Sequence, residues 1–352
     1  MSITSIARPE IQALVPYSAA EQVDATVRLN ANEAPLPISG DRFRRPLNRY
    51  PEVRPNRLGT ALAAHFGVAP EKTLVTRGSS EAIDLLIRAF CRAGIDNIVT
   101  TAPSFSMYRH YAVVQGAAVR EVKTNPDNDF AITANDILEA CDSNTRLVFL
   151  CSPNNPTGNL LERDVLINIL EARSNKSAIV VDEAYIEFSG TAGCADLLDQ
   201  YDNLIVLRTL SKALAFAGAR CGAAIGPREV IRMLSAVQAP YAMATPVSEC
   251  VEDALQESGI QEAASRIADI ALERDRMSTA LQKFWFVERF WPSAANFLFI
   301  KLRDADRVLA QVSKDKVLIR DFGGDLADCV RITIGSRTEN DQLLASLGRV
   351  SR

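Results

Sequence analysis

Residues 147–158 read LVFLCSPNNPTG, a short apolar run followed at once by two prolines, two asparagines and a glycine. We interpret Leu147–Cys151 as a buried strand and the remainder as a tight turn at its carboxyl end. Two later stretches, AIVVDEAY (178–185) and LIVLRTLSK (204–212), also place polar residues directly after an apolar run. Ligands of α/β proteins bind beyond the carboxyl ends of such strands. We therefore expect a binding site made by the loops that follow these strands.

Short apolar strands alternate with amphipathic helices, such as Glu162–Ala172, between residues 73 and 225. This alternation predicts an α/β domain with a covered, mainly parallel sheet of seven strands, extending over residues 41–240. The predicted strands are Thr73–Thr76, Asn97–Thr101, Ala118–Val122, Leu147–Cys151, Ala178–Asp182, Leu204–Leu207 and Cys221–Ile225.

The pattern changes after Pro246. A long helix is predicted over Gly259–Lys283, and three further strands are predicted at Phe297–Lys301, Val317–Arg320 and Val330–Ile334. We expect residues 241–352 to form a smaller α+β domain. Residues 1–40 contain no core of their own, and we expect this N-terminal segment to pack with the small domain.

The composition excludes several classes of protein. Thirty-nine Lys and Arg residues against 43 Asp and Glu residues give a net charge of -4, which argues against binding to duplex nucleic acid. We see no secretory signal and no apolar run of the roughly 18 residues that a membrane helix needs, so we expect a cytoplasmic protein. Seven cysteines without a CxxC pair, and only two histidines, predict neither a disulfide framework nor a metal site.

Four polar features occur in order along the chain: TRGSS (76–80), SPNNPTG (152–158), DEAY (182–185), and RTLSK (208–212) followed by GARCG (218–222). Each has an ordinary interpretation when taken alone, as a helix cap, a turn or a solvated lysine. Together they supply a nucleophilic amine, an acid for a ring cation, an amide, a phenol and donors for a phosphate. Those groups are what a pyridoxal 5′-phosphate enzyme needs.

The ordered set of motifs resembles the fold-type-I aminotransferases, and among them the histidinol-phosphate aminotransferases. The resemblance covers nearly the whole chain and implies an α/β fold with pyridoxal 5′-phosphate as cofactor. The matching stretches are LNANE (29–33), RYPE (49–52), TRGSSEAIDLLIRAF (76–90), LCSPNNPTG (150–158), IVVDEAYIEF (179–188), LRTLSKA (207–213) and VRITIG (330–335).

The resemblance also implies roles for residues around the cofactor. Lys212 would carry it, and Asp182 would pair with its pyridine nitrogen. Tyr185 and Asn155 would bind the phenolic oxygen of the ring, and Phe105 would stack on the ring. Several hydroxyl and guanidinium groups would hold the phosphate, namely those of Ser79, Ser80, Thr209, Ser211 and Arg220. A partly dry site beside a cationic arginine is also expected to lower the pKa of the Lys212 amine.

The substrate side is implied by the same resemblance. Arg331 would bind the anionic end of each substrate, while Arg320, Tyr17 and Asn32 would contact the amino donor. Tyr50 matches a tyrosine that reaches the cofactor phosphate of a neighbouring subunit, so we expect a homodimer with shared active sites. Without the resemblance, we would interpret Tyr50 as a buried aromatic residue ahead of a turn.

The implied reaction transfers the amino group of L-histidinol phosphate to 2-oxoglutarate. Two alternatives share the cofactor motifs, an aromatic amino acid aminotransferase and a threonine-phosphate decarboxylase. A regulatory protein of the same fold would need an added DNA-binding segment, and we find none before residue 28 or after Arg331. One departure concerns Ala34, where the family often has asparagine, and it bears on the choice of substrate.

Overall fold

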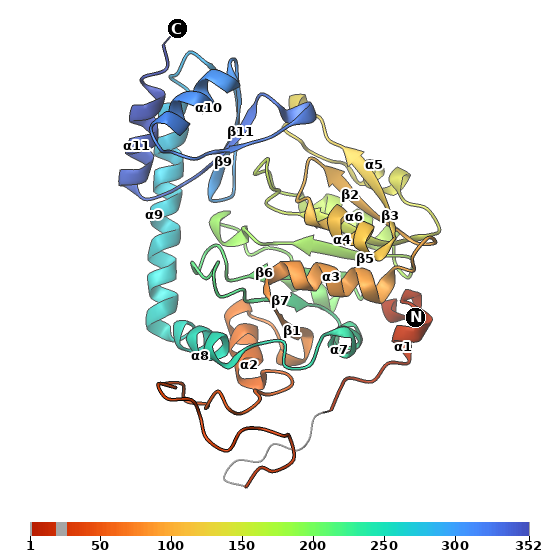
Figure 1. Cartoon of the computed structure of the whole chain (residues 1–352). Coiled ribbons are helices and arrows are strands. Elements are labelled where there is room, and N and C mark those ends of the chain that lie inside the picture. The colour runs from red at the N-terminus through yellow and green to blue at the C-terminus, as the bar shows by residue number, and fades with distance from the viewer. Residues whose placement is uncertain (1, 19–26, 352) are drawn as a thin grey trace.

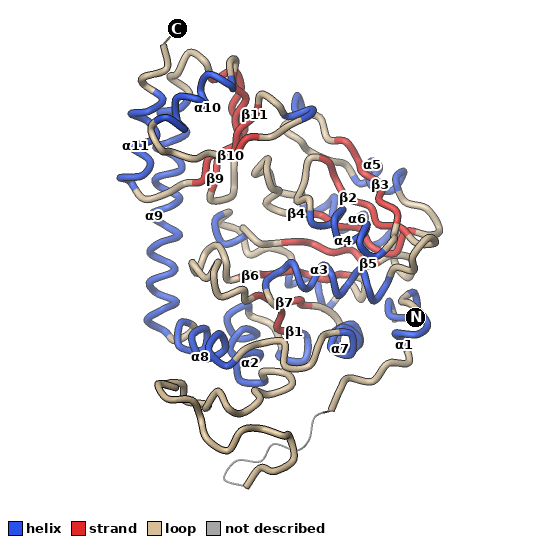
Figure 2. The backbone as a smooth tube through the Cα atoms, in the orientation of Figure 1, coloured by secondary structure: helices blue, strands red, loops and turns tan. Residues whose placement is uncertain are grey.

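The computed structural model describes residues 2–18 and 27–351, in which a seven-stranded sheet and a four-stranded sheet form separate layers (Figures 1 and 2). The strand order of the large sheet is β1-β7-β6-β5-β4-β2-β3. Strand β7 runs antiparallel to β1 and β6, and the other neighbouring pairs are parallel. The prediction of a mainly parallel seven-stranded sheet is confirmed. Its strands are β1 (Thr73–Thr76), β2 (Asn97–Ala102), β3 (Ala118–Lys123), β4 (Thr145–Cys151), β5 (Ala178–Asp182), β6 (Leu204–Thr209) and β7 (Gly222–Ile225).

Helices cover both faces of this sheet because successive side chains of a strand point to opposite faces. In β4, Leu147 and Phe149 pack with α3, α4 and α7, whereas Val148 and Leu150 pack with α5 and α6. All four side chains are at most 1% exposed, so the central strands are apolar on both faces. The helices of this part of the chain are α2 (Asn56–Phe66), α3 (Gly78–Phe90), α4 (Met107–Gln115), α5 (Ala134–Ala140), α6 (Arg163–Ala172), α7 (Arg228–Val237) and α8 (Thr245–Ala254).

The 25-residue helix α9 (Glu257–Leu281) leads from the large sheet to the small one (Figure 1). The small sheet is antiparallel with the order β10-β11-β9-β8, and it packs against α9, α10 (Ala305–Lys314) and α11 (Arg337–Leu347). Its strands are β8 (Val287–Trp291), β9 (Phe297–Leu302), β10 (Arg320–Asp321) and β11 (Cys329–Thr333). We did not predict β8, an edge strand that carries the charged residues Glu288 and Arg289 and so lacks a clear apolar pattern.

The described beginning of the N-terminal segment packs on the large domain and not, as we expected, on the small one. Ile3 is fully buried and joins the apolar cluster of α3 and α7. The backbone N–H of Arg8 donates to the carbonyl of Ala89 at 3.0 Å, which ties α1 (Pro9–Gln12) to the end of α3. The error arose because a short segment without periodicity carries no signal for the surface on which it packs. The domain boundaries at residues 40 and 240 stay predictions.

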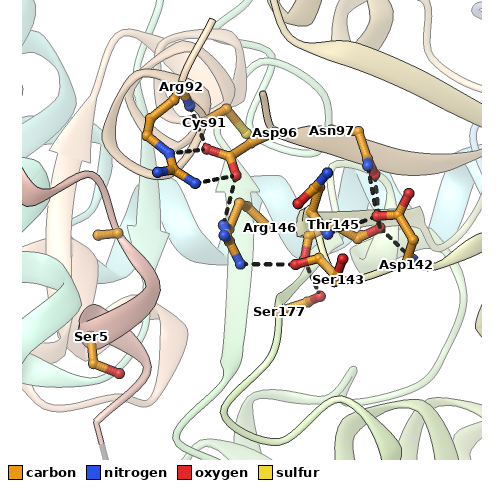
Figure 3. Close-up of polar contacts among 12 residues, drawn as sticks. Ser5, Cys91, Arg92, Asp96, Asn97, Asp142, Ser143, Thr145, Arg146 and Ser177 are labelled. Carbon is orange, nitrogen blue, oxygen red and sulfur yellow. Dashed lines mark hydrogen bonds and ion pairs between the residues drawn. The ribbon is translucent and has the colours of Figure 1, made fainter. Parts of the chain in front are cut away.

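A buried polar network joins the amino ends of β2 and β4 (Figure 3). The side chain of Asp96 is fully buried and pairs with Arg92 at 2.8 Å and Arg146 at 3.0 Å. Beside it, the Thr145 hydroxyl donates to the Asn97 amide oxygen at 2.7 Å. Burial raises the pKa of Asp96, but Arg92 and Arg146 outweigh it and lower this pKa below its ordinary value. Buried ion pairs therefore stabilise the edge of the sheet at the amino ends of the strands, which is opposite to the edge at their carboxyl ends.

Candidate active site

Lys212 lies in the turn after β6 and lines a cavity of about 140 Å³ at the carboxyl ends of the strands. Its ammonium nitrogen lies 5.5 Å from the centre of the Tyr185 ring. Burial lowers the pKa of Lys212, as do the charges of Arg331 and Arg220, while Asp182 acts in the opposite direction. The prediction of a lowered pKa is confirmed. A larger neutral fraction makes this amine a better nucleophile.

Asp182 ends β5 and is 2% exposed. One of its carboxylate oxygens accepts a hydrogen bond from the Tyr108 hydroxyl at 2.9 Å, and the other accepts one from the Ala184 N–H at 3.2 Å. Burial raises the pKa of Asp182 to about 6, against the effects of these two hydrogen bonds and of the Lys212 charge. A buried anion with so little compensation suits a cationic ligand.

Asn155 connects the large sheet to the small one. Its amide N–H donates to the Tyr185 hydroxyl at 3.3 Å, and its amide oxygen accepts from the Arg331 guanidinium. Arg331 lies on β11, and its guanidinium carbon is 5.4 Å from the centre of the Phe297 ring. Arg320 lies opposite Arg331 in the register of β10 and β11, but it is exposed. An amide, a phenol and an arginine thus meet beside the cavity.

Ser79 and Ser80 lie in the first turn of α3, where backbone N–H groups are free of intrahelical partners. Gly78 begins this helix with a φ of +72°, and a Cβ at this position would lie 2.7 Å from an Arg220 guanidinium nitrogen. A side chain at Gly78 would therefore displace Arg220. The helix N-terminus and the guanidinium together favour an anion.

The hydroxyls of Thr209 and Ser211 lie opposite this helix end. Thr209 donates to Ser211 at 3.0 Å, and Arg220 donates to the Ser211 hydroxyl at 3.1 Å. These contacts bring the end of β6 and Arg220, two residues before β7, to one place. The anion side of the cavity thus has donors from α3, β6 and the loop before β7.

The cavity brings together ten residues that the sequence singled out. They are Ser79, Ser80, Phe105, Asn155, Asp182, Tyr185, Thr209, Ser211, Lys212 and Arg220. Its wall also contains Cys151 and Ala184, which we had not singled out. No group of three or more metal-binding side chains occurs within residues 2–18 and 27–351.

Three other predicted residues lie outside this cavity. Asn32 and Tyr50 belong to an N-terminal arm, residues 27–50 (Figure 1), and Tyr17 precedes it in the sequence. Tyr17 and Tyr50 are 53% and 51% exposed. Tyr50 stacks on Tyr241 with ring centres 4.7 Å apart, and Tyr17 meets the same ring edge-on at 6.4 Å. Asn32 adopts a left-handed backbone conformation in the arm. Within one chain, none of these side chains lines the Lys212 cavity.

Sequence reasoning missed Tyr108, which is fully buried and donates to Asp182. Its ring stacks on Phe149 at 4.9 Å and meets Phe105 edge-on at 5.7 Å. The available signal was an aromatic residue near the start of α4, close in sequence to the predicted Phe105. Nothing local indicated that its hydroxyl would reach a carboxylate 74 residues away.

The sequence profile of the family described as "Aminotransferase class I and II" matches residues 26–347. A histidinol-phosphate aminotransferase of Aeromonas salmonicida (strain A449) is 41% identical over 357 aligned positions, covering 99% of this chain and 98% of the relative.

Solved structures show the same fold. The histidinol-phosphate aminotransferase from Clostridium acetobutylicum superposes with a TM-score of 0.77 at 26% identity, covering 86% of this chain and 90% of that one. An L-threonine-O-3-phosphate decarboxylase from Porphyromonas gingivalis has a TM-score of 0.72 at 24% identity, with coverages of 86% and 90%. The fold alone therefore does not distinguish amino transfer from decarboxylation.

Replacing Asp182 with asparagine should stabilise the chain without cofactor, and more at neutral than at acidic pH. The folded-state pKa of Asp182, about 6, lies above its ordinary value of 3.8, so the folded state binds more protons than the unfolded state between these values. Stability is therefore lost as pH rises through that window, by on the order of 3 kcal/mol. Asp182→Asn should recover this loss almost fully at pH 7.5 but only about a third of it at pH 4.5, as urea unfolding would measure. An equal difference at both pH values would contradict the raised pKa.

Proposed function

The chain belongs to the class I and II aminotransferase family, and we propose that it transfers the amino group of L-histidinol phosphate to 2-oxoglutarate. The products would be 3-(imidazol-4-yl)-2-oxopropyl phosphate and L-glutamate, in the biosynthesis of histidine. The observation that carries this proposal is the 41% identity, over 99% of the chain, to a histidinol-phosphate aminotransferase. We propose a cytoplasmic location. No helix within residues 2–18 and 27–351 is long and apolar enough to cross a membrane.

Pyridoxal 5′-phosphate is the cofactor of this family, and the residues of the cavity fit it. Hydroxyls, helix N–H groups and Arg220 at one side match its phosphate. The buried, poorly compensated Asp182 carboxylate matches its ring nitrogen. When bound, the cofactor supplies an aldehyde carbon that accepts the amino group and a ring that withdraws electrons from the bond to be broken.

We assign Lys212 two tasks. Its amine would hold the cofactor covalently, and after release it would move a proton as general base and then as general acid. A lowered pKa serves both tasks, because the amine must be neutral to accept a proton. Asp182 would keep the ring nitrogen protonated through a charge-assisted hydrogen bond, an interaction of roughly 1.5–3 kcal/mol. Tyr185 and Asn155 would orient the ring from the side of its phenolic oxygen.

Arg331 is the residue placed best for the substrate. It is half-buried, contacts Asn155, and carries a positive charge next to Lys212. Each substrate has an anionic group, a phosphate in one and carboxylates in the other, and a guanidinium binds either type in a forked geometry. Arg320, on the neighbouring strand, would contact the amino donor from the exposed side, as would Tyr17 and Asn32.

An amino-donor screen tests the proposed reaction. Purified protein loaded with pyridoxal 5′-phosphate receives 2-oxoglutarate and one of three amines: L-histidinol phosphate, L-phenylalanine or O-phospho-L-threonine. We expect the highest kcat/KM for glutamate formation with histidinol phosphate, and no release of carbon dioxide. Fastest glutamate formation with phenylalanine would indicate an aromatic aminotransferase, and carbon dioxide from phosphothreonine would indicate a decarboxylase.

Lys212→Ala should separate cofactor binding from turnover. The phosphate contacts remain in this variant, so it should still bind pyridoxal 5′-phosphate, whereas turnover should fall by about 10²–10⁴-fold or more. In the wild type, borohydride should fix the cofactor irreversibly, and peptide mass spectrometry should find it on Lys212. A label on any other lysine would contradict the assignment.

We propose a homodimer with shared active sites. Ten of the sixteen large apolar side chains that are exposed among the described residues lie between Leu14 and Tyr50. The described parts of this stretch, residues 14–18 and 27–50, lie largely outside the layers of sheets and helices (Figure 1). A monomer rarely leaves so much apolar surface together in water, and a two-fold partner would cover it with the same surface of its own. Tyr50 would then reach the cofactor phosphate in the partner's cavity.

Mixing Lys212→Ala, which should be inactive, with a severely impaired Tyr50 variant such as Tyr50→Ala tests the shared site. If Tyr50 acts across the interface, a dimer of one Lys212→Ala chain and one Tyr50→Ala chain has one site with both lesions and one intact site. Random reassortment of equal amounts should then restore about a quarter of the wild-type activity. Mixing Lys212→Ala with a chain that carries both substitutions is the control and should restore nothing. No recovery in the first mixture would mean that Tyr50 acts within its own chain.

A further inference from the structure

Glu183 and Arg208 lie next to the two residues that would hold opposite ends of the cofactor. Glu183 directly follows Asp182 at the end of β5, and Arg208 directly precedes Thr209 at the end of β6. These strands are parallel neighbours, with Asp182 opposite Leu207. Since successive side chains of a strand alternate between its faces, Glu183 and Arg208 are on the face away from Asp182 and Thr209.

The two side chains form a buried ion pair, to which Glu187 adds a second carboxylate. The Arg208 Nε lies 2.7 Å from a Glu183 carboxylate oxygen, and an Arg208 terminal nitrogen lies 3.4 Å from Glu187. The three side chains are 9%, 2% and 16% exposed, for Arg208, Glu183 and Glu187. We call these three residues the strand clamp.

Residues of two other segments contact the side chains of the strand clamp. The second oxygen of Glu183 accepts a hydrogen bond from the Cys194 N–H at 2.7 Å. The preceding residue, Gly193, has a φ of +76°, and a Cβ there would lie 2.4 Å from that same oxygen. On the other side, the guanidinium carbon of Arg208 lies 5.7 Å from the centre of the Phe66 ring. The Cys194 N–H and Gly193 therefore constrain one oxygen of Glu183, and Phe66 packs on the guanidinium of Arg208.

Stability alone does not account for such an arrangement. Taking a carboxylate and a guanidinium out of water costs free energy that their attraction often does not recover, and apolar residues of similar volume commonly stabilise a fold as well or better. Burial raises the pKa of both Glu183 and Glu187, and Arg208 only partly offsets this rise. We therefore explain the buried charges by their effect on the geometry of the ends of β5 and β6.

We propose that the strand clamp is a positioning device that fixes the separation between Asp182 and Thr209, and through them the placement of the bound cofactor. The cofactor is a rigid ring that carries a phosphate, so it must contact Asp182 at one end and Thr209 at the other at the same time. A shift of one strand end would therefore misplace the cofactor. A misplacement of about 1 Å at a reacting centre can cost on the order of 100-fold in rate. This proposal rests on the proposed cofactor site.

Two variants test the strand clamp. Arg208→Met removes the cation but keeps an unbranched, flexible stem, and Glu183→Gln keeps both the size and the acceptor for the Cys194 N–H. The dissociation constant of pyridoxal 5′-phosphate is measured by titrating cofactor-free protein and following the visible absorption. The visible circular dichroism of the loaded protein reports how the cofactor lies. We expect a rise in the dissociation constant on the order of tenfold or more, and altered circular dichroism, in both variants.

Arg146→Met is the matched control, because it removes an arginine from the buried carboxylate Asp96 at the opposite edge of the same sheet (Figure 3). It should lower the melting temperature of the cofactor-free protein while leaving cofactor affinity and circular dichroism as in the wild type. The double variant Glu183→Gln/Arg208→Met should lose no more affinity than the worse single variant, because the pair acts as a unit.

The outcomes separate this proposal from the proposed function. If the wild type itself binds no pyridoxal 5′-phosphate, the cofactor site is wrong and the strand clamp proposal fails with it. If the wild type binds it and both clamp variants bind it equally well with unchanged circular dichroism, only the strand clamp proposal is wrong. If Arg146→Met changed cofactor affinity and circular dichroism as much as the clamp variants do, those changes would reflect general stability, and the strand clamp proposal would again be wrong. Should Arg208→Met fail to fold, the nearly isosteric Glu183→Gln decides the question alone.

Discussion

Burial of the Asp182 carboxylate at the end of the middle strand of the large sheet is the constraint on which the site depends. Two hydrogen bonds and a nearby lysine compensate it only in part, so its pKa stays well above the ordinary value. A protonated ring nitrogen would supply the missing positive charge. The chain without cofactor thus holds an unfavourable anion, and the same feature that lowers its stability would favour binding of the cofactor.

The strand order explains how the other groups come to surround this carboxylate. Strands β4, β5 and β6 are neighbours, so the loops after them carry Asn155, Tyr185 and Lys212 to one edge. Strand β7 is antiparallel, and its beginning lies at that edge, which brings Arg220 there. Strand β1 pairs with β7, and the helix that follows it therefore presents Ser80 to Arg220's side of the cavity. Residues more than 130 positions apart meet because of this order alone.

Much of this site could be predicted from one sequence because its residues lie in short motifs at strand ends. Ten of the predicted residues line a single cavity. Tyr17, Asn32, Tyr50, Arg320 and Arg331 do not. The proposed role of Tyr50 depends on a second subunit, whose position no single chain specifies. Tyr108 was missed because a buried aromatic residue after a turn looks like any core residue. Its hydrogen bond to Asp182 depends on how α4 packs on the sheet.

The sequence by itself determined the class of fold and the order of the polar motifs at the strand ends, which include Asp182 and Lys212, because strand periodicity and turn residues act over a few neighbours. Only the tertiary structure decided that Ile3 packs on the large domain, that Tyr108 reaches Asp182, and that Glu183 pairs with Arg208 behind the cofactor strands. Those contacts depend on the registers and the packing of elements distant in the chain. No local pattern of side chains encodes such distances.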